Sequence, residues 1–150
     1  MERRQLYWED VEVGQEIPSS YSLKLDATRF SLQVSGTQDY YPVHHDRDFA
    51  RAQGVPDIFM NTGFLTAATG RLLTDWMGPE GWLSKYRIEM RKMNLLGDTM
   101  TVKGKVTDKY IREGLHCVDA DVWCETDTQG VTTPCKATMI LPAKYGNTNR

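Results

Sequence analysis

The spacing of hydrophobic residues changes once along the chain and divides it into two parts. Between Asp26 and Met77 the apolar residues recur every three or four positions, which is typical of helices that bury one face. From Trp82 onward apolar and polar residues alternate, which is typical of strands with one dry face. The sequence therefore predicts helices first and an antiparallel sheet afterwards.

Three helices are expected in the first part. Asp26 and Asp46 are suitable N-caps for two short helices, because their carboxylates can accept the free amides of a first turn. A longer helix is expected over residues 61–76, where Gly78 and Pro79 stop it. Apolar residues cover most of its circumference, so we expect other elements to wrap around it. These residues are Phe64, Leu65, Ala67, Ala68, Leu72, Leu73 and Trp76.

The second part predicts four strands separated by turn sequences at residues 96–98, 113–114 and 129–130. We expect these strands to form a meander, with a further strand near residues 21–25 joining the sheet. The expected buried positions are Tyr86, Ile88 and Met90, then Met100, Val102 and Val106, then Val118, Ala120, Val122 and Cys124, then Cys135, Ala137, Met139 and Leu141. One antiparallel sheet curled around one apolar helix is an α+β arrangement, and the hot-dog fold answers that description.

Composition narrows the class of protein. A chain of 150 residues fits a single domain, 1–150, and its net charge of −2 favours neither nucleic acid nor an anionic membrane as a partner. No apolar stretch is long enough to span a bilayer or to serve as a signal peptide, so a cytoplasmic protein is expected. The three cysteines lack metal-type spacing and are expected to be buried, reduced thiols.

The densest polar loop lies between the first two helices and holds Asp39 and His44. Pro42 stiffens this bend, so the two side chains can converge on one point. A carboxylate beside an imidazole can take a proton from water near neutral pH and return one elsewhere. Taken alone, such a pair is more often a helix cap or a solvated pair. Because His45 would point away from His44 in extended backbone, no metal site is expected.

The same loop resembles the signature of the MaoC-like dehydratases and (R)-specific enoyl-CoA hydratases. That signature has a Gly shortly before an Asp, then Pro, an aliphatic residue, His and a later small residue. The matching positions are Gly36, Asp39, Pro42, Val43, His44 and Ala50. The stretches at residues 7–14 and 96–99 resemble the family as well, so the likeness extends over nearly the whole chain.

This resemblance implies a lyase that adds water reversibly to a trans-2-enoyl-CoA and gives the (R)-3-hydroxyacyl-CoA. It implies Asp39 and His44 as the acid–base pair, no metal and no cofactor other than the CoA of the substrate. The backbone amide of Gly63 is the candidate donor to the thioester oxygen, and Asn61 is a candidate side-chain contact. Equally, Asn61 could be only an N-cap and Gly63 only a packing glycine. The family also implies a homodimer, or a heteromer with a related hot-dog chain, whose substrate tunnel follows the interface.

Two departures from the family pattern affect the expected substrate. Tyr41 stands where the family commonly has Asn, and Asn61-Thr62-Gly63 stands where it often has His-Gly. We expect Tyr41 to change the shape of the substrate pocket, and residues 57–61 resemble the branch that handles bulky acyl groups, including steroid side chains. Arg91 and Lys92, with Arg87, are candidates for the CoA phosphates or ordinary charges on a wet strand face. A hot-dog thioesterase and a non-catalytic subunit of a heteromeric hydratase are the alternatives.

Overall fold

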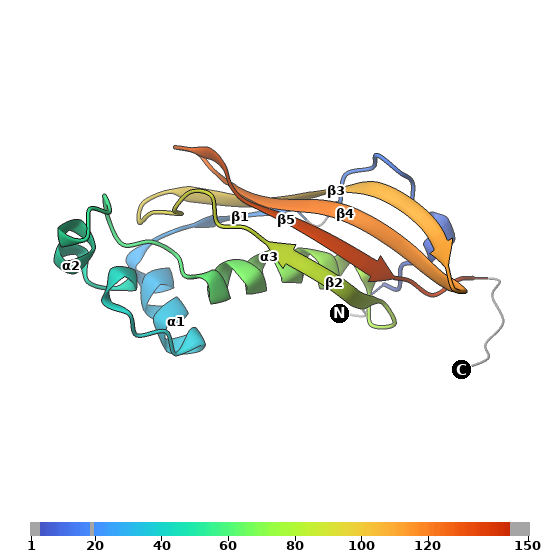
Figure 1. Ribbon diagram of the computed structural model, residues 1–150, viewed down its shortest axis with the longest axis horizontal. Helices are drawn as coiled ribbons and strands as arrows, with labels where there is room; N and C mark the ends of the chain where they lie inside the picture. Colours follow the sequence, from blue (N-terminus) through green and yellow to red (C-terminus); the bar gives the residue numbers. More distant parts are fainter. Residues whose placement is uncertain (1–3, 19, 145–150) are drawn as a thin grey trace.

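The computed structural model of the protein describes residues 4–18 and 20–144, and five strands and three α-helices lie within them (Figure 1). The helices are α1 (Ala27–Thr37), α2 (Arg47–Ala52) and α3 (Thr62–Met77), with single turns of 3-10 helix at Trp8–Asp10 and Pro42–His44. The strands are β1 (Tyr21–Lys24), β2 (Trp82–Ile88), β3 (Thr99–Arg112), β4 (Leu115–Thr126) and β5 (Gly130–Ile140). The α+β class is confirmed, with a curled antiparallel sheet packed against one long helix.

The helix boundaries follow the capping residues found in the sequence. The side chain of Asp26 accepts a hydrogen bond from the amide of Arg29, and that of Asp46 accepts one from Phe49. Asn61 caps α3 in the same way, through the amide of Phe64. Each cap satisfies an amide that the first turn of a helix leaves without a partner, and so fixes where the helix starts.

The prediction of a four-strand meander is wrong at β2. The strand order is β1-β3-β4-β5-β2, so β2 pairs with β5 at one edge and only β3, β4 and β5 form a meander. Ten residues, 89–98, separate β2 from β3. This segment is too long for a hairpin turn. It passes the start of β5 instead, where the amides of Arg91 and Lys92 donate to the carbonyl of Thr132. Met90, expected in the strand, lies in this crossing and is exposed.

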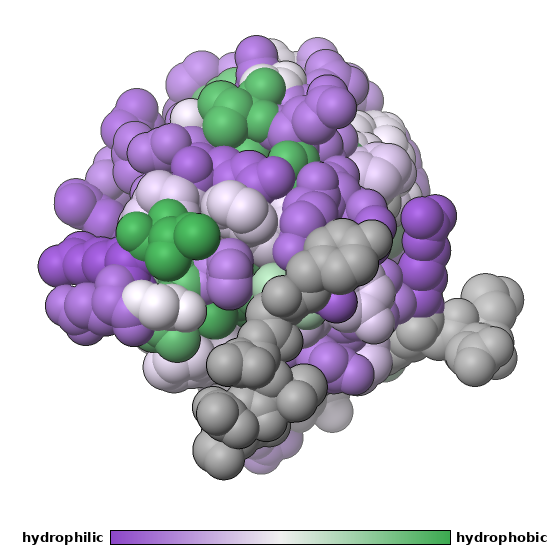
Figure 2. Space-filling view, turned by 90° about the vertical axis from the view of Figure 1, so that its right-hand side faces the viewer, coloured by the Kyte–Doolittle hydropathy of each residue, from purple (hydrophilic) through white to green (hydrophobic). Residues whose placement is uncertain are grey.

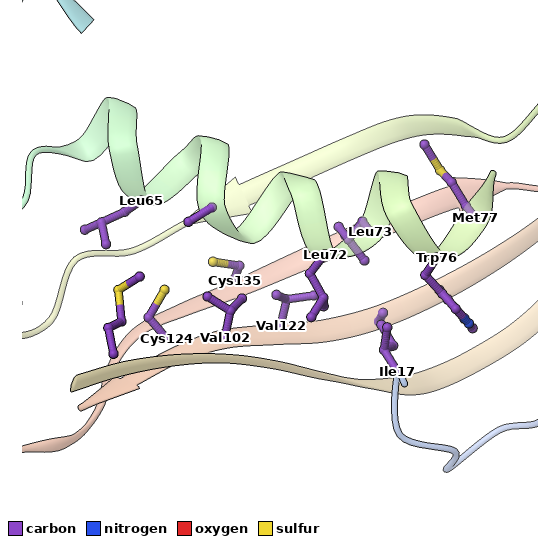
Figure 3. Close-up of a cluster of buried hydrophobic side chains, with 14 of the residues drawn as sticks. Ile17, Leu65, Leu72, Leu73, Trp76, Met77, Val102, Val122, Cys124 and Cys135 are labelled. Atoms are coloured by element: carbon purple, nitrogen blue, oxygen red, sulfur yellow. The ribbon is translucent and has the colours of Figure 1, made fainter. Parts of the chain in front are cut away.

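One side of α3 and the concave face of the sheet form the core (Figure 3). The alternation predicted for β3, β4 and β5 is confirmed, since Met100, Val118 and Met139 are fully buried and their neighbours in sequence are more exposed. Gly104 of β3 lets the helix come close, because a Cβ there would lie 3.0 Å from a methyl group of Leu72. The three cysteines are free and buried as expected, and burial raises the pKa of the Cys124 thiol to about 12.

The other side of α3 is not covered by the described part of the chain. Figure 1 shows α3 lying along the concave side of the sheet with its far side open. Gly63, Ala67, Arg71 and Thr74 are exposed there, whereas the sequence predicted burial on most of the circumference. Residues 4–18 and 20–144 therefore cover only one side of the central helix.

The two ends of the molecule differ in character. The helices α1 and α2 and the start of α3 gather at one end (Figure 1). The opposite end is mainly hydrophilic, with hydrophobic residues in small separate patches (Figure 2). Among the described residues, none of the helices is long and apolar enough to cross a membrane.

Candidate active site

The loop with the Asp–His motif joins α1 to α2, as predicted. Helix α1 ends when Gln38 adopts a left-handed conformation with φ 56°, which turns the chain before Asp39. The 3-10 turn Pro42–His44 then folds the loop back, and Asp46 starts α2 directly afterwards. Two helix termini and one proline therefore hold the motif.

The structure brings Asp39 and His44 together. The Oδ2 atom of Asp39 lies 3.3 Å from Nε2 of His44. The imidazole is buried, whereas 42% of the Asp39 side chain is accessible, so the pair faces outward through the carboxylate. The amide of Tyr41 donates to Oδ1 of Asp39 at 3.4 Å and restrains it.

A second contact fixes the tautomer of His44. Its Nδ1 atom lies 2.8 Å from the carbonyl oxygen of Phe59. A carbonyl can only accept, so Nδ1 carries the proton and Nε2 of the neutral ring presents a lone pair toward Asp39. The Phe59 ring packs edge-on against the imidazole, with the ring centroids 4.9 Å apart. Two acceptors side by side, Nε2 and Oδ2, suit a water molecule that donates one hydrogen bond to each.

The start of α3 lies next to the end of α1. A Cβ built on Gly63 would lie 3.0 Å from the methyl group of Thr37, two residues before Asp39. The cap from Asn61 satisfies the amide of Phe64, which leaves the amides of Thr62 and Gly63 without an intrahelical partner. Because the helix dipole adds partial positive charge at this end, these two amides suit an oxygen that gains negative charge.

Asn61 itself does not face the solvent. Its side chain is buried, accepts from Phe64 and donates to the hydroxyl of Thr37 at 2.7 Å. Both ends of its amide are therefore engaged, which favours the capping interpretation over direct contact with a substrate.

The remaining predicted residues lie around this centre. Tyr41 is exposed, and its ring contacts Phe49 edge-on at 5.8 Å between centroids. Arg91 forms an ion pair with Glu89, and Lys92 donates to the carbonyl of Gln129. Arg91 and Lys92 line a cavity of about 370 Å³, whose other walls are Pro56, Phe59, Met90, Met93, Leu95 and Gln129. This cavity adjoins the site through Phe59, and Met90 touches the Thr62 hydroxyl at the start of α3.

Three residues at the site were missed from the sequence: Gln33, Thr37 and Phe59. Gln33 follows Phe30 at helical spacing on the buried side of α1, and Thr37 lies one turn further on, exposed at the end of the helix. A glutamine on an otherwise buried helix face was the available signal, because a buried amide requires partners. Phe59 contributes its backbone carbonyl. Because every residue has this group, the sequence gives no signal for such a role.

No cluster of three or more potential metal ligands occurs among residues 4–18 and 20–144. His45 is exposed, next to the buried His44. The chemistry that this site offers is therefore that of a carboxylate, an imidazole and free helix amides.

Comparisons with known proteins identify the family of this chain. The family model of the MaoC like domain matches residues 10–127. The 3-oxo-4,17-pregnadiene-20-carboxyl-CoA hydratase beta subunit of Mycobacterium tuberculosis is 38% identical over 108 residues, which are 71% of this chain and 80% of that protein.

Solved structures share the fold. A chain of the ChsH1-ChsH2 complex from Mycobacterium tuberculosis superposes with a TM-score of 0.77 and 29% identity, covering 87% of this chain and 98% of that chain. The unliganded R-hydratase PhaJ1 from Pseudomonas aeruginosa superposes with a TM-score of 0.76 at 19% identity. The match covers 93% of this chain and 88% of that chain. The expected hot-dog fold is confirmed.

Proposed function

The chain belongs to the family of the MaoC-like domain, and from this we propose that it is a hydro-lyase acting on acyl-CoA thioesters. It adds water reversibly to a trans-2-enoyl-CoA and gives the (R)-3-hydroxyacyl-CoA. The observation that carries this proposal is the Asp39–His44 pair, 3.3 Å apart, with the tautomer of His44 set by the carbonyl of Phe59. The pair is intact, which argues against a non-catalytic subunit.

The pair is suited to activate water. A water held between Oδ2 of Asp39 and Nε2 of His44 keeps a lone pair free for C3 of the substrate. As its oxygen bonds to C3, one proton leaves to the acid–base pair and the C2–C3 π electrons move toward C2. The pair then delivers a proton to C2, so the overall change is addition of H and OH. No metal and no further cofactor is needed, because CoA enters as part of the substrate.

The start of α3 is suited to bind the thioester oxygen. That oxygen gains negative charge while the electrons are delocalised between C2 and the carbonyl group. We place it at the free amides of Thr62 and Gly63, where donors are already oriented and the helix dipole is favourable. Gly63 has no side chain to obstruct the thioester.

The acyl group is proposed to be bulky. The 38% identical relative is named as the beta subunit of a hydratase of a pregnadiene carboxyl-CoA, which is a large polycyclic thioester. Tyr41 is exposed on the catalytic loop, between Asp39 and His44, and offers an aromatic surface to such a group. Arg91 and Lys92 lie on the rim of the adjoining cavity, where their charges suit the phosphates of CoA.

A substrate series tests this proposal. We expect the purified protein, alone or with its partner chain, to remove the enoyl absorbance of trans-2-enoyl-CoAs, with a higher kcat/KM for polycyclic than for short linear acyl groups. Chiral analysis of the product should show the (R) alcohol. Activity should survive EDTA and dialysis. Release of free CoA without hydration would instead identify a thioesterase, and activity that requires added metal would contradict the mechanism.

The role of Gly63 can be tested separately. We expect Gly63→Ala to lower kcat by about 10-fold or more, since a new Cβ would press on the Thr37 methyl group at 3.0 Å and disturb the donor amide. Thr37→Ser removes that methyl group and keeps the hydroxyl. The double variant should therefore recover part of the lost kcat. If Gly63→Ala has full activity, this amide does not bind the thioester oxygen.

A further inference from the structure

The side chain of Gln33 lies between the two halves of the site, which are the Asp39–His44 pair and the first turn of α3. It comes from α1, and only 2% of the residue is exposed. Its Nε2 atom lies 3.4 Å from the carbonyl oxygen of Phe59 and 3.5 Å from that of His44. Its Oε1 atom accepts the backbone amide of Asn61 at 2.8 Å.

Each of these partners belongs to one half of the site. The carbonyl of Phe59 is the group that also accepts Nδ1–H of His44 and so determines which ring nitrogen faces Asp39. Asn61 is the N-cap of α3, whose first amides are assigned to the thioester oxygen. A single amide group thus contacts both the support of the base and the start of the oxyanion-binding helix.

A second path closes this arrangement into a ring. The hydroxyl of Thr37 donates to the backbone carbonyl of Gln33 at 2.6 Å and accepts from the Asn61 side chain at 2.7 Å. Among the described residues, no buried side-chain nitrogen or oxygen is left without a hydrogen bond. The side chains of Gln33 and Asn61 are buried in this ring, whereas Thr37 is exposed at its edge. Movement of either buried amide breaks hydrogen bonds that water cannot readily replace.

We propose that Gln33 is a positioning residue, which sets the distance between the Asp39–His44 pair and the first amides of α3. This inference rests on the proposed hydratase function. Hydration requires the attacking water at C3 and the oxyanion donors at the thioester to be aligned at the same moment. A misplacement of about 1 Å between such groups can cost up to about 10²-fold in rate. Glutamine fits because it offers a donor and an acceptor on one rigid plane.

Gln33→Glu and Gln33→Leu test this role. Glutamate keeps the shape, but its ionised form sets a carboxylate oxygen against the carbonyls of Phe59 and His44. We expect kcat to fall about 10- to 10²-fold in both variants, with KM changed less than about threefold. Burial without a positive partner favours the protonated form of the new carboxyl group, which can donate as the amide does. The Gln33→Glu rate relative to the unmodified protein should therefore rise as pH falls, whereas the Gln33→Leu ratio should stay constant.

Asn94 supplies the matched control. It is an equally buried amide whose side-chain hydrogen bonds go to Thr132 and Thr133 on β5. Its backbone carbonyl, which accepts the amide of Met60, is unchanged by the exchange. Asn94→Asp makes the same isosteric exchange, so we expect lower stability with kcat retained, measured well below both melting temperatures. Equal losses of kcat in the two exchanges, or a Gln33→Glu ratio independent of pH, would overturn the positioning role.

A readout without substrate separates this inference from the proposed function. The ¹⁵N chemical shifts of the His44 ring report its tautomer in the resting protein. We expect Nδ1–H alone in the unmodified protein and a mixture of tautomers in Gln33→Leu. If the unmodified protein hydrates no enoyl-CoA, the proposed function fails, while an altered tautomer in Gln33→Leu still supports positioning. An unaltered tautomer refutes positioning even when the protein is an active hydratase.

Discussion

Replacing Asp39 by Asn, or His44 by Ala, is expected to lower kcat by at least about 10²-fold, the usual contribution of a general acid–base group. His44→Ala removes one of the two acceptors that hold the water, and Asp39→Asn removes the carboxylate charge that attracts its proton. In Asp39→Asn the loss has a second cause. The carboxylate of Asp39 lies 3.3 Å from Nε2 of His44, so the amide that replaces it can donate to this nitrogen. It then occupies the lone pair that would accept from the water.

The effects on stability should separate the two residues. The Asp39 side chain is 42% accessible, and its contacts with His44 and the Tyr41 amide are long, so Asp39→Asn should leave the melting temperature nearly unchanged. His44→Ala removes a buried ring and its bond to Phe59, which costs about 1–3 kcal/mol. Steady-state kinetics at a temperature below the melting transitions of both variants distinguishes a loss of catalysis from a loss of folded protein.

Neighbouring residues give the controls for this experiment. His45 is exposed beside His44, and Asp48 is exposed in the first turn of α2. We expect His45→Ala and Asp48→Asn to keep near-normal kcat. If either Asp39→Asn or His44→Ala also keeps near-normal kcat on the best substrate, that residue is not part of the acid–base pair.

The parts of the structure that depend on local sequence could be predicted. Asp26, Asp46 and Asn61 start helices because a cap bonds to an amide three residues away. Asp39 and His44 meet because only five positions and one proline separate them. The dry faces of β3, β4 and β5 follow from alternation alone.

The features that could not be predicted depend on contacts between residues far apart in the sequence. The alternation in β2 shows that it is a strand, but not that it pairs with β5 across the sheet. The partners of Gln33 lie in a loop and a helix start that reach it only in the folded chain. The wrong prediction that α3 is buried on most of its circumference has the same cause. Apolar residues all around a helix predict burial, but they do not show which element or chain covers each side.

That exposed side leads to the prediction about assembly. The strand β2 lies at an edge of the sheet, and Trp82 at its start is 62% exposed. An exposed strand edge beside a large apolar side chain is a surface that proteins cover or pair. Gly63, Ala67 and Arg71 line the open side of α3, along which a substrate bound at the helix start would extend. The described part of the chain provides only one wall for that substrate.

We therefore expect the active form to be a homodimer, or a heteromer with a related hot-dog chain, with Asp39 and His44 near the interface. The similar chain in the ChsH1-ChsH2 structure belongs to such a complex of two named subunits. Sedimentation equilibrium at micromolar concentration should give a mass well above the 17.1 kDa of one chain. The β2 edge and the open side of α3 are the surfaces to test.

Trp82→Glu tests the edge directly. We expect it to shift the protein toward the monomer and to lower activity at dilute concentration, with recovery as the protein is concentrated. Ile111→Glu is the matched control, because Ile111 is 57% exposed near the β3–β4 turn and should leave the mass unchanged. A fully active monomer of the unmodified chain would refute the assembly. An inactive monomer that gains activity on mixing with a second hot-dog chain identifies the heteromer, because each chain then supplies the wall that the other lacks.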